Sequence, residues 1–109
     1  MPYNEGLAQR VRTALAAHTA VDEKKMFGGL TFMLNGHMCC GIVRDELMVR
    51  VGLDQYADAI VQPHARQMDF TGRRMRGMIM VAPAGLESDA DLEAWVQRGV
   101  TFAAGLPAK

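Results

Sequence analysis

The chain has 109 residues, 50% of them hydrophobic, and carries 12 basic and 12 acidic side chains. This length and composition fit one compact domain, residues 1–109, around a single core. A net charge of zero gives no global attraction to nucleic acid or to an anionic membrane. The sequence has no apolar run of the roughly 20 residues that a membrane span needs, and its start lacks the apolar centre of a signal peptide. We therefore expect a cytoplasmic protein without membrane contact.

Three segments have the periodicity of amphipathic helices. The first begins at Asn4, a favourable helix cap, and extends to near His18. The second is expected to start at a cap on Asp54 and to end at Val61. The third begins at Ser88. Its broad apolar face comprises Leu92, Trp95, Val96, Gly99, Phe102, Ala103 and Leu106.

Apolar segments between these helices alternate with period two, which predicts strands. Asn35-Gly36 is the strongest hairpin signal in the chain, because these residue types suit a two-residue turn. The expected strands are residues 25–27, 30–34, 37–43, 47–51, 66–71 and 77–81. Strands joined by tight turns are antiparallel. The prediction is an α+β, two-layer domain of three helices and an antiparallel sheet of about five strands, in the order α-β-β-β(-β)-α-β-β-α.

A two-residue turn at 35–36 predicts which residues face each other across the hairpin. The pairs are Leu34 with His37, Met33 with Met38, and Phe32 with Cys39. The two faces then hold Leu30, Phe32 and Leu34 on one side, and Met33, Met38, Cys40 and Ile42 on the other. Because both faces are apolar, helices should cover one of them. A second copy of the chain, or other segments of the same chain, should cover the other.

Methionine is concentrated in the predicted sheet, since all eight internal methionines lie between residues 26 and 80. Methionine is common on surfaces that adapt to a partner, and it also fills cores. Strand alternation directs Met48 away from its neighbours in the sequence. Met33, Met38 and Met48 are therefore candidates for a dimer or partner surface, with plain core packing as the alternative.

The sharpest cluster of charge is formed by Arg73, Arg74 and Arg76. Residues 66–77 contain four arginines and one acid, and such a turn could bind phosphates through charge-assisted hydrogen bonds. Two alternatives remain open. The arginines could be a solvated turn that keeps a sheet edge soluble, or they could pair with residues 87–98, which hold four acids and one base.

His37 and Cys39 are two residues apart on a predicted strand, so their side chains should share a face. Both residue types bind zinc or copper, and an imidazole can activate a nearby thiolate. A metal site needs further ligands, however, and the remaining histidines and carboxylates show no ligand spacing. The simpler interpretation is that Cys39 is a small core residue beside a half-exposed histidine.

Several motifs follow one another in a fixed order: KKMFGG at 24–29, LNG at 34–36, LMVRV at 47–51, MDFTGR at 68–73, then Pro83 and a final helix with Leu92 and Trp95. In this order they resemble the N-terminal domain of the TfoX/Sxy family, bacterial regulators of competence genes. The resemblance implies a two-layer domain similar in topology to secretion chaperones, which commonly dimerise. It also implies a standalone N-terminal domain, because the full-length regulators continue into a C-terminal helical domain. The family supplies no established catalytic residues.

These observations favour a non-enzymatic protein-interaction module, an adaptor in transcriptional regulation that forms a homodimer, meets an unknown protein partner and needs no cofactor. Direct nucleic-acid binding through Arg73, Arg74 and Arg76 is the first alternative. A small metal or thiol protein centred on His37 and Cys39 is the second.

Overall fold

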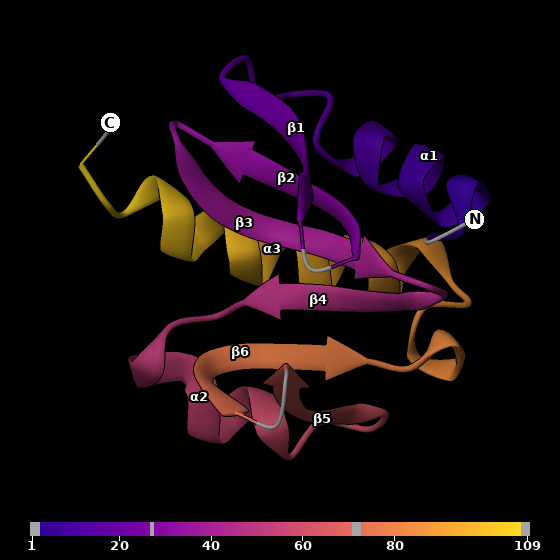
Figure 1. The fold of residues 1–109 in the computed structure, drawn as a ribbon, viewed down its shortest axis with the longest axis vertical. Helices are drawn as coiled ribbons and strands as arrows, with labels where there is room; N and C mark the ends of the chain where they lie inside the picture. The colour runs from indigo at the N-terminus through magenta and orange to yellow at the C-terminus, as the bar shows by residue number, and fades with distance from the viewer. Residues whose placement is uncertain (1–2, 27, 71–72, 108–109) are drawn as a thin grey trace.

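The computed structural model describes residues 3–26, 28–70 and 73–107, with side chains for all of these except 69, 70 and 73–76 (Figure 1). Three α-helices and six strands follow one another in the described residues: α1 (Glu5–Ala14), β1 (Val21–Met26), β2 (Gly29–Leu34), β3 (His37–Val43), β4 (Glu46–Arg50), α2 (Leu53–Ile60), β5 (Ala65–Phe70), β6 (Arg73–Val81) and α3 (Asp89–Ala104). The strands form one antiparallel sheet in the order β1-β2-β3-β4-β6-β5. The predicted α+β fold is confirmed.

Two of the three predicted helix caps are confirmed. The Asn4 side chain accepts a hydrogen bond from the Leu7 amide at 3.0 Å, and Ser88 caps α3 in the same manner. The predicted cap at Asp54 is wrong, because α2 begins at Leu53 and Gly52 is its N-cap. Gly52 has a φ of 83°, a backbone conformation that glycine adopts without a steric penalty.

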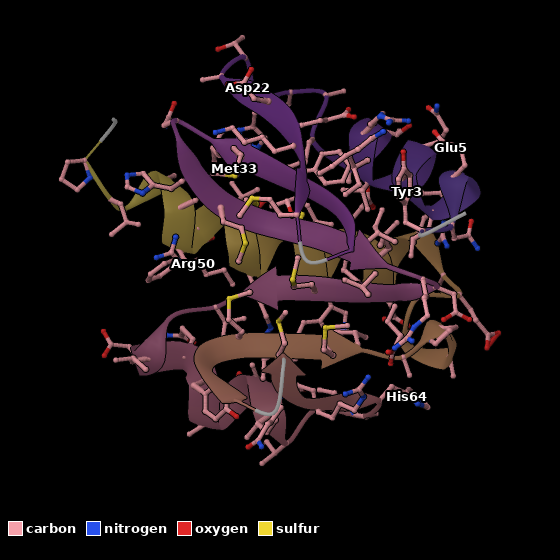
Figure 2. The ribbon with its side chains drawn as sticks, viewed as in Figure 1. Tyr3, Glu5, Asp22, Met33, Arg50 and His64 are labelled. Carbon is pink, nitrogen blue, oxygen red and sulfur yellow. The ribbon has the colours of Figure 1, made fainter. Side chains whose placement is uncertain are left out.

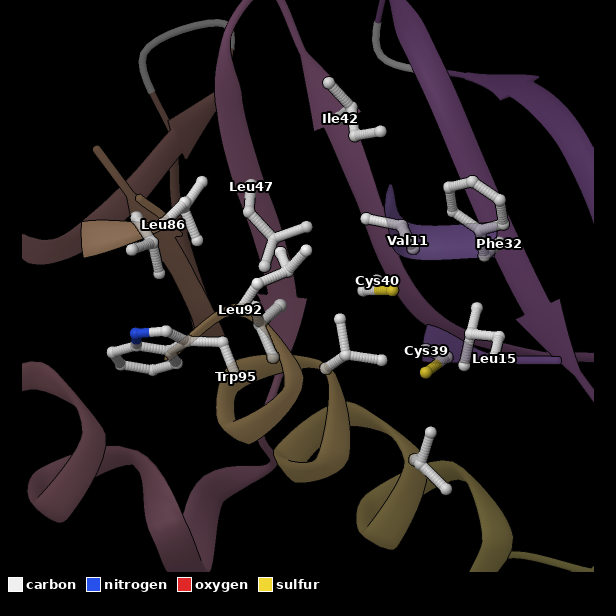
Figure 3. Close-up of a cluster of buried hydrophobic side chains, with 14 of the residues drawn as sticks. Val11, Leu15, Phe32, Cys39, Cys40, Ile42, Leu47, Leu86, Leu92 and Trp95 are labelled. Carbon is white, nitrogen blue, oxygen red and sulfur yellow. The ribbon is translucent and has the colours of Figure 1, made fainter. Parts of the chain in front are cut away.

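All three helices lie on the same face of the sheet. In Figure 1, α3 runs behind β3 and β4, which it contacts together with β2. The shorter α2 packs against β6 and β5, and α1 packs beside α3. Figure 3 shows the resulting core between sheet and helices, to which α3 contributes Leu92 and Trp95, α1 contributes Val11, and the sheet contributes Phe32 and Leu47.

The β2–β3 hairpin contains a register shift that the sequence did not reveal. The predicted pairs of Leu34 with His37 and of Met33 with Met38 are confirmed, but Phe32 pairs with Cys40, not with Cys39. A bulge of this kind inserts one unpaired residue and reverses the alternation beyond it. Cys40 therefore lies with Phe32 in the core under the helices, and so does Ile42. The predicted position of Cys40 and Ile42 on the opposite face is therefore wrong.

The opposite face carries a second, smaller core made of methionine. Four of its residues are buried and pack together: Met48, Met68, Met78 and Met80. Sulfur atoms gather over β3, β4 and β6 in Figure 2, on the side turned away from α3. Figure 1 shows β6 bending sharply in its first half, and Gly77 in this strand has a φ of 79°. Because these methionines are buried in a single copy of the chain, other segments of the same chain cover the cluster.

An ion-pair network joins α1 to the outermost strand, β1. Arg12 contacts both carboxylate oxygens of Glu23, at 2.7 and 2.9 Å, and Glu5 at 2.8 Å. These hydrogen bonds raise the pKa of Arg12 above its usual range, and the bond from Arg12 lowers the pKa of Glu23. Because Glu23 is paired with Phe32, its side chain lies on the helix side of the sheet.

This network predicts a small, pH-dependent contribution to stability. Glu23→Gln should lower the free energy of unfolding near neutral pH by less than about 1 kcal/mol, because the partners are partly exposed. The pKa of Glu23 is lower in the folded chain, so the contribution is complete above the ordinary glutamate pKa and is lost as the pH falls through the folded-state value. Urea unfolding near pH 7 and near pH 2 measures this difference.

The matched control is Glu93→Gln, since Glu93 is exposed on α3 and has no ion pair among the described residues. It should leave stability almost unchanged at both pH values. A Glu23→Gln effect that is as large in acid as at neutral pH would contradict the assignment.

Candidate functional site

The three methionines predicted to form a partner surface are not equally accessible. Met48 is fully buried in the methionine cluster, so it offers no surface to a partner of the folded chain. Met33 and Met38 are opposite each other and half-buried. Met38 packs against the cluster. Dimerisation through these residues stays a prediction, and the closed cluster removes the main physical reason for it.

Arg73, Arg74 and Arg76 lie at the start of β6. The backbone register places Arg73 opposite Phe70 and Arg74 opposite Asp69. The side chains of these residues lie outside the described part of the chain, and binding of nucleic acid by the three arginines stays a prediction.

His37 and Cys39 have separate surroundings. A ring nitrogen of His37 lies 2.6 Å from the carbonyl oxygen of Pro107, whereas Cys39 is buried beneath α3. The largest cause that raises the pKa of the neighbouring Cys40 thiol is a hydrogen bond with Cys39, and the next largest is burial. Raised pKa values keep thiols protonated and unreactive. No group of three or more potential metal ligands occurs in the described part of the chain.

A groove runs between α2 and α3 in the helix layer. Two cavities lie along it. One joins the start of α2 to the end of α3 and has a volume of about 470 Å³. The other joins residues 62–64, which follow the end of α2, to the first half of α3 and has a volume of about 320 Å³. The two helices therefore run antiparallel, and we call the space between them the α2–α3 groove.

The larger cavity is mostly apolar. Its walls include Leu53 from the first turn of α2, Phe102 and Leu106 from α3 and the chain beyond it, and Val51, which directly follows β4. Gly52 allows this arrangement, because a Cβ atom there would collide with the Phe102 ring. Leu53 is 67% exposed. A large apolar side chain at the mouth of an apolar cavity is suited to contact with another apolar surface.

The smaller cavity is more polar and holds the single tryptophan of the chain. Trp95 lies in its wall together with His64, Gln62, Asp91 and Arg98. Figure 3 shows the Trp95 ring on the side of α3 that is turned toward α2, next to Leu86. His64 has a φ of 68°, which turns the chain sharply between α2 and β5. This end of the groove combines an aromatic edge with hydrogen-bonding groups.

Arg98 connects the two cavities, since it contributes to the walls of both. Its guanidinium bridges the groove to Asp58 of α2 at 2.9 Å and lies 5.2 Å from the centre of the Trp95 ring. The positive charge of Arg98 is thus paired with a carboxylate of the same chain. Asp54 and Asp91, one at each end of the groove, have no ion pair in the described residues. The groove therefore has mostly apolar walls in its larger cavity and one such carboxylate in each cavity, and the guanidinium of Arg50 lies 4.9 Å from the centre of the Phe102 ring in the wall of the larger one.

The sequence pattern does not reveal this groove. The predicted apolar face of the last helix, with Trp95, Phe102 and Leu106, is correct, but no sequence pattern marks Leu53 or Arg98. The available signal was the width of that face: seven apolar positions are more than one side of a helix needs to cover a small sheet.

Comparison with known proteins identifies a family to which the chain is similar. The family described as the TfoX N-terminal domain matches residues 13–103 of the chain. No curated protein and no solved structure matches it. Among the described residues, no helix is long and apolar enough to cross a membrane.

Proposed function

Because the chain belongs to the TfoX N-terminal domain family, we propose that it is a non-enzymatic interaction module, an adaptor in transcriptional regulation, that binds a segment of a partner protein in the α2–α3 groove. The observation that carries the proposal is the apolar cavity of about 470 Å³ with Leu53 exposed at its mouth. Ligand sites are typically concave, mostly apolar and of this size.

The groove also favours a particular partner chemistry. Its apolar end has space for one aromatic or large aliphatic side chain between Leu53 and Phe102. The carboxylate of Asp54, in the same cavity, favours a basic side chain next to that anchor, and the carboxylate of Asp91 favours another in the smaller cavity. A segment with an apolar anchor flanked by lysine or arginine fits both features.

Two exposed residues of the same helix region provide a matched pair of variants. Leu53 lines the apolar cavity, whereas Val61, which is 75% exposed and directly follows α2, lines neither cavity of the groove. Peptides selected from a random display library on the wild-type chain should contain the apolar and basic pattern. Leu53→Glu should weaken their binding at least tenfold, about 1.4 kcal/mol, and Val61→Glu should leave it unchanged.

Fluorescence titration with the selected peptides measures the affinities, since Trp95 is the single tryptophan and lies in the groove. Peptides that bind both variants equally would place the partner surface elsewhere. A library that yields no binding peptide would contradict the proposal itself.

A further inference from the structure

The outer edge of β1 is unpaired within the described part of the chain. β1 is the first strand of the sheet and is hydrogen-bonded only to β2 there. Every residue from Asp22 to Met26 is exposed. An exposed strand edge of this kind presents a row of free N–H and C=O groups and is a template for another strand.

The backbone register shows which groups point outward. The Ala20 carbonyl accepts a hydrogen bond from the Asn35 amide at 3.0 Å. Hydrogen-bonded pairs alternate along an antiparallel ladder, so Asp22 and Lys24 bond to β2. Val21, Glu23 and Lys25 therefore direct their N–H and C=O groups away from the sheet.

The charges of β1 are divided along its length. Asp22 and Glu23 form its acidic first half, and Lys24 and Lys25 form its basic second half. A parallel neighbour with the same sequence would place like charges together, whereas an antiparallel one places acids beside bases. The charge order thus favours a second copy of this chain, related by a two-fold axis through the edge.

We infer that two copies of this chain pair through their β1 strands and form one continuous antiparallel sheet. A two-fold axis perpendicular to the sheet keeps the helix layers of both copies on the same side of the joined sheet. It also places the free N–H and C=O groups of one β1 strand opposite those of the other. Val21 is then opposite Lys25 of the second copy, and Glu23 lies at the axis. This inference goes beyond the proposed function, because the β1 edge is separate from the α2–α3 groove.

Side chains support this register on both faces. Asp22 is opposite Lys24 of the second copy, twice by symmetry, at the non-hydrogen-bonded positions where side chains are closest. The two Glu23 residues meet at the axis, but each carboxylate is already held by Arg12 of its own chain at 2.7 and 2.9 Å. Arg12 therefore offsets the one like-charge contact that the symmetry creates. Short strands bury little area, so the dissociation constant should be on the order of 10–100 µM.

A charge swap tests the pairing in the full chain. Asp22→Lys and Lys24→Asp should each weaken self-association about tenfold or more, because each turns both attractive contacts into repulsive ones. An equimolar mixture of the two variants should form a heterodimer at least as tight as the wild-type dimer. Sedimentation equilibrium measures the dissociation constants of the homodimers and of the heterodimer, and circular dichroism confirms that each variant is folded. Asp45→Lys, the same charge change in the exposed β3–β4 turn, should leave the dimer intact.

A second pair of variants tests the backbone contacts alone. Lys25→Pro removes an outward N–H and is tolerated at a sheet edge, so it should dissociate the dimer, whereas Lys25→Ala should not. A wild-type chain that stays monomeric near 1 mM would overturn the inference. So would a dimer that Asp22→Lys and Lys25→Pro leave unchanged, because its interface would lie elsewhere. Peptide binding in the groove is read from Trp95 fluorescence and can succeed or fail independently of either result.

Discussion

A Gly99→Ala variant should be less stable than the wild type by about 3 kcal/mol, one of the two largest effects we expect. Gly99 lies where α3 crosses the bulge of β3. A Cβ atom there would collide with the carbonyl oxygen of Cys39 and would lie 3.1 Å from its carbonyl carbon and 3.2 Å from its sulfur. Backbone atoms cannot yield as a flexible side chain does, so α3 must move off the sheet. The cost exceeds the gain of about 1 kcal/mol in helix propensity.

Urea unfolding followed by circular dichroism measures the loss. Gly105→Ala is the matched control at the end of the same helix, because a Cβ there would make ordinary contacts at 3.4 and 3.5 Å and the backbone φ is −77°. It should change stability by less than about 1 kcal/mol. A Gly99→Ala protein as stable as the Gly105→Ala protein would show that α3 does not approach β3 so closely.

The second large effect is expected for Trp95→Ala, a loss of about 3–5 kcal/mol. Trp95 is 8% exposed, belongs to the main core and lies beneath the guanidinium of Arg98. Its removal leaves a cavity between α3 and α2 that the short α2 cannot fill without moving. Thermal unfolding by circular dichroism measures the loss. Trp95→Phe keeps most of the apolar contact and should cost about half as much or less. A Trp95→Ala loss below about 1 kcal/mol would contradict the packing.

The sequence predicts the elements of this fold well where local chemistry decides them. Asn35 and Gly36 have φ values of 54° and 84°, as a type I′ hairpin requires, and Asn4 and Ser88 cap their helices. The last helix buries five of its seven predicted apolar residues, and the other two, Phe102 and Leu106, are half-buried and line the groove.

Features that depend on tertiary contacts were not predictable in this way. The bulge between Phe32 and Met33 leaves no mark in the residue pattern, because apolar residues fill both sides of β3. For this reason Cys40 was assigned to the wrong face. The closed methionine cluster likewise depends on how the strands curve, so burial of Met48 could not be distinguished from exposure at a partner surface.

The α2–α3 groove escaped prediction for a related reason. Its two walls are separated in the sequence by β5 and β6, and only the packing of α2 on β6 and of α3 on β3 and β4 leaves a space between them. The salt bridge from Arg98 to Asp58, which spans this space, joins residues 40 positions apart. Such a pair cannot be identified from spacing within one helix.

Binding between α2 and α3 is tested most directly by ¹H–¹⁵N NMR spectra of the full chain, recorded during titration with a selected peptide. The expected result is a set of shifted amides confined to the walls of the two cavities, namely the first turn of α2, residues 62–64, 84–85 and 91–106 and the Trp95 indole, with much smaller shifts in the Leu53→Glu protein. Shifts centred on the methionine cluster or on β1, with the groove unaffected at saturation, would contradict the proposed site.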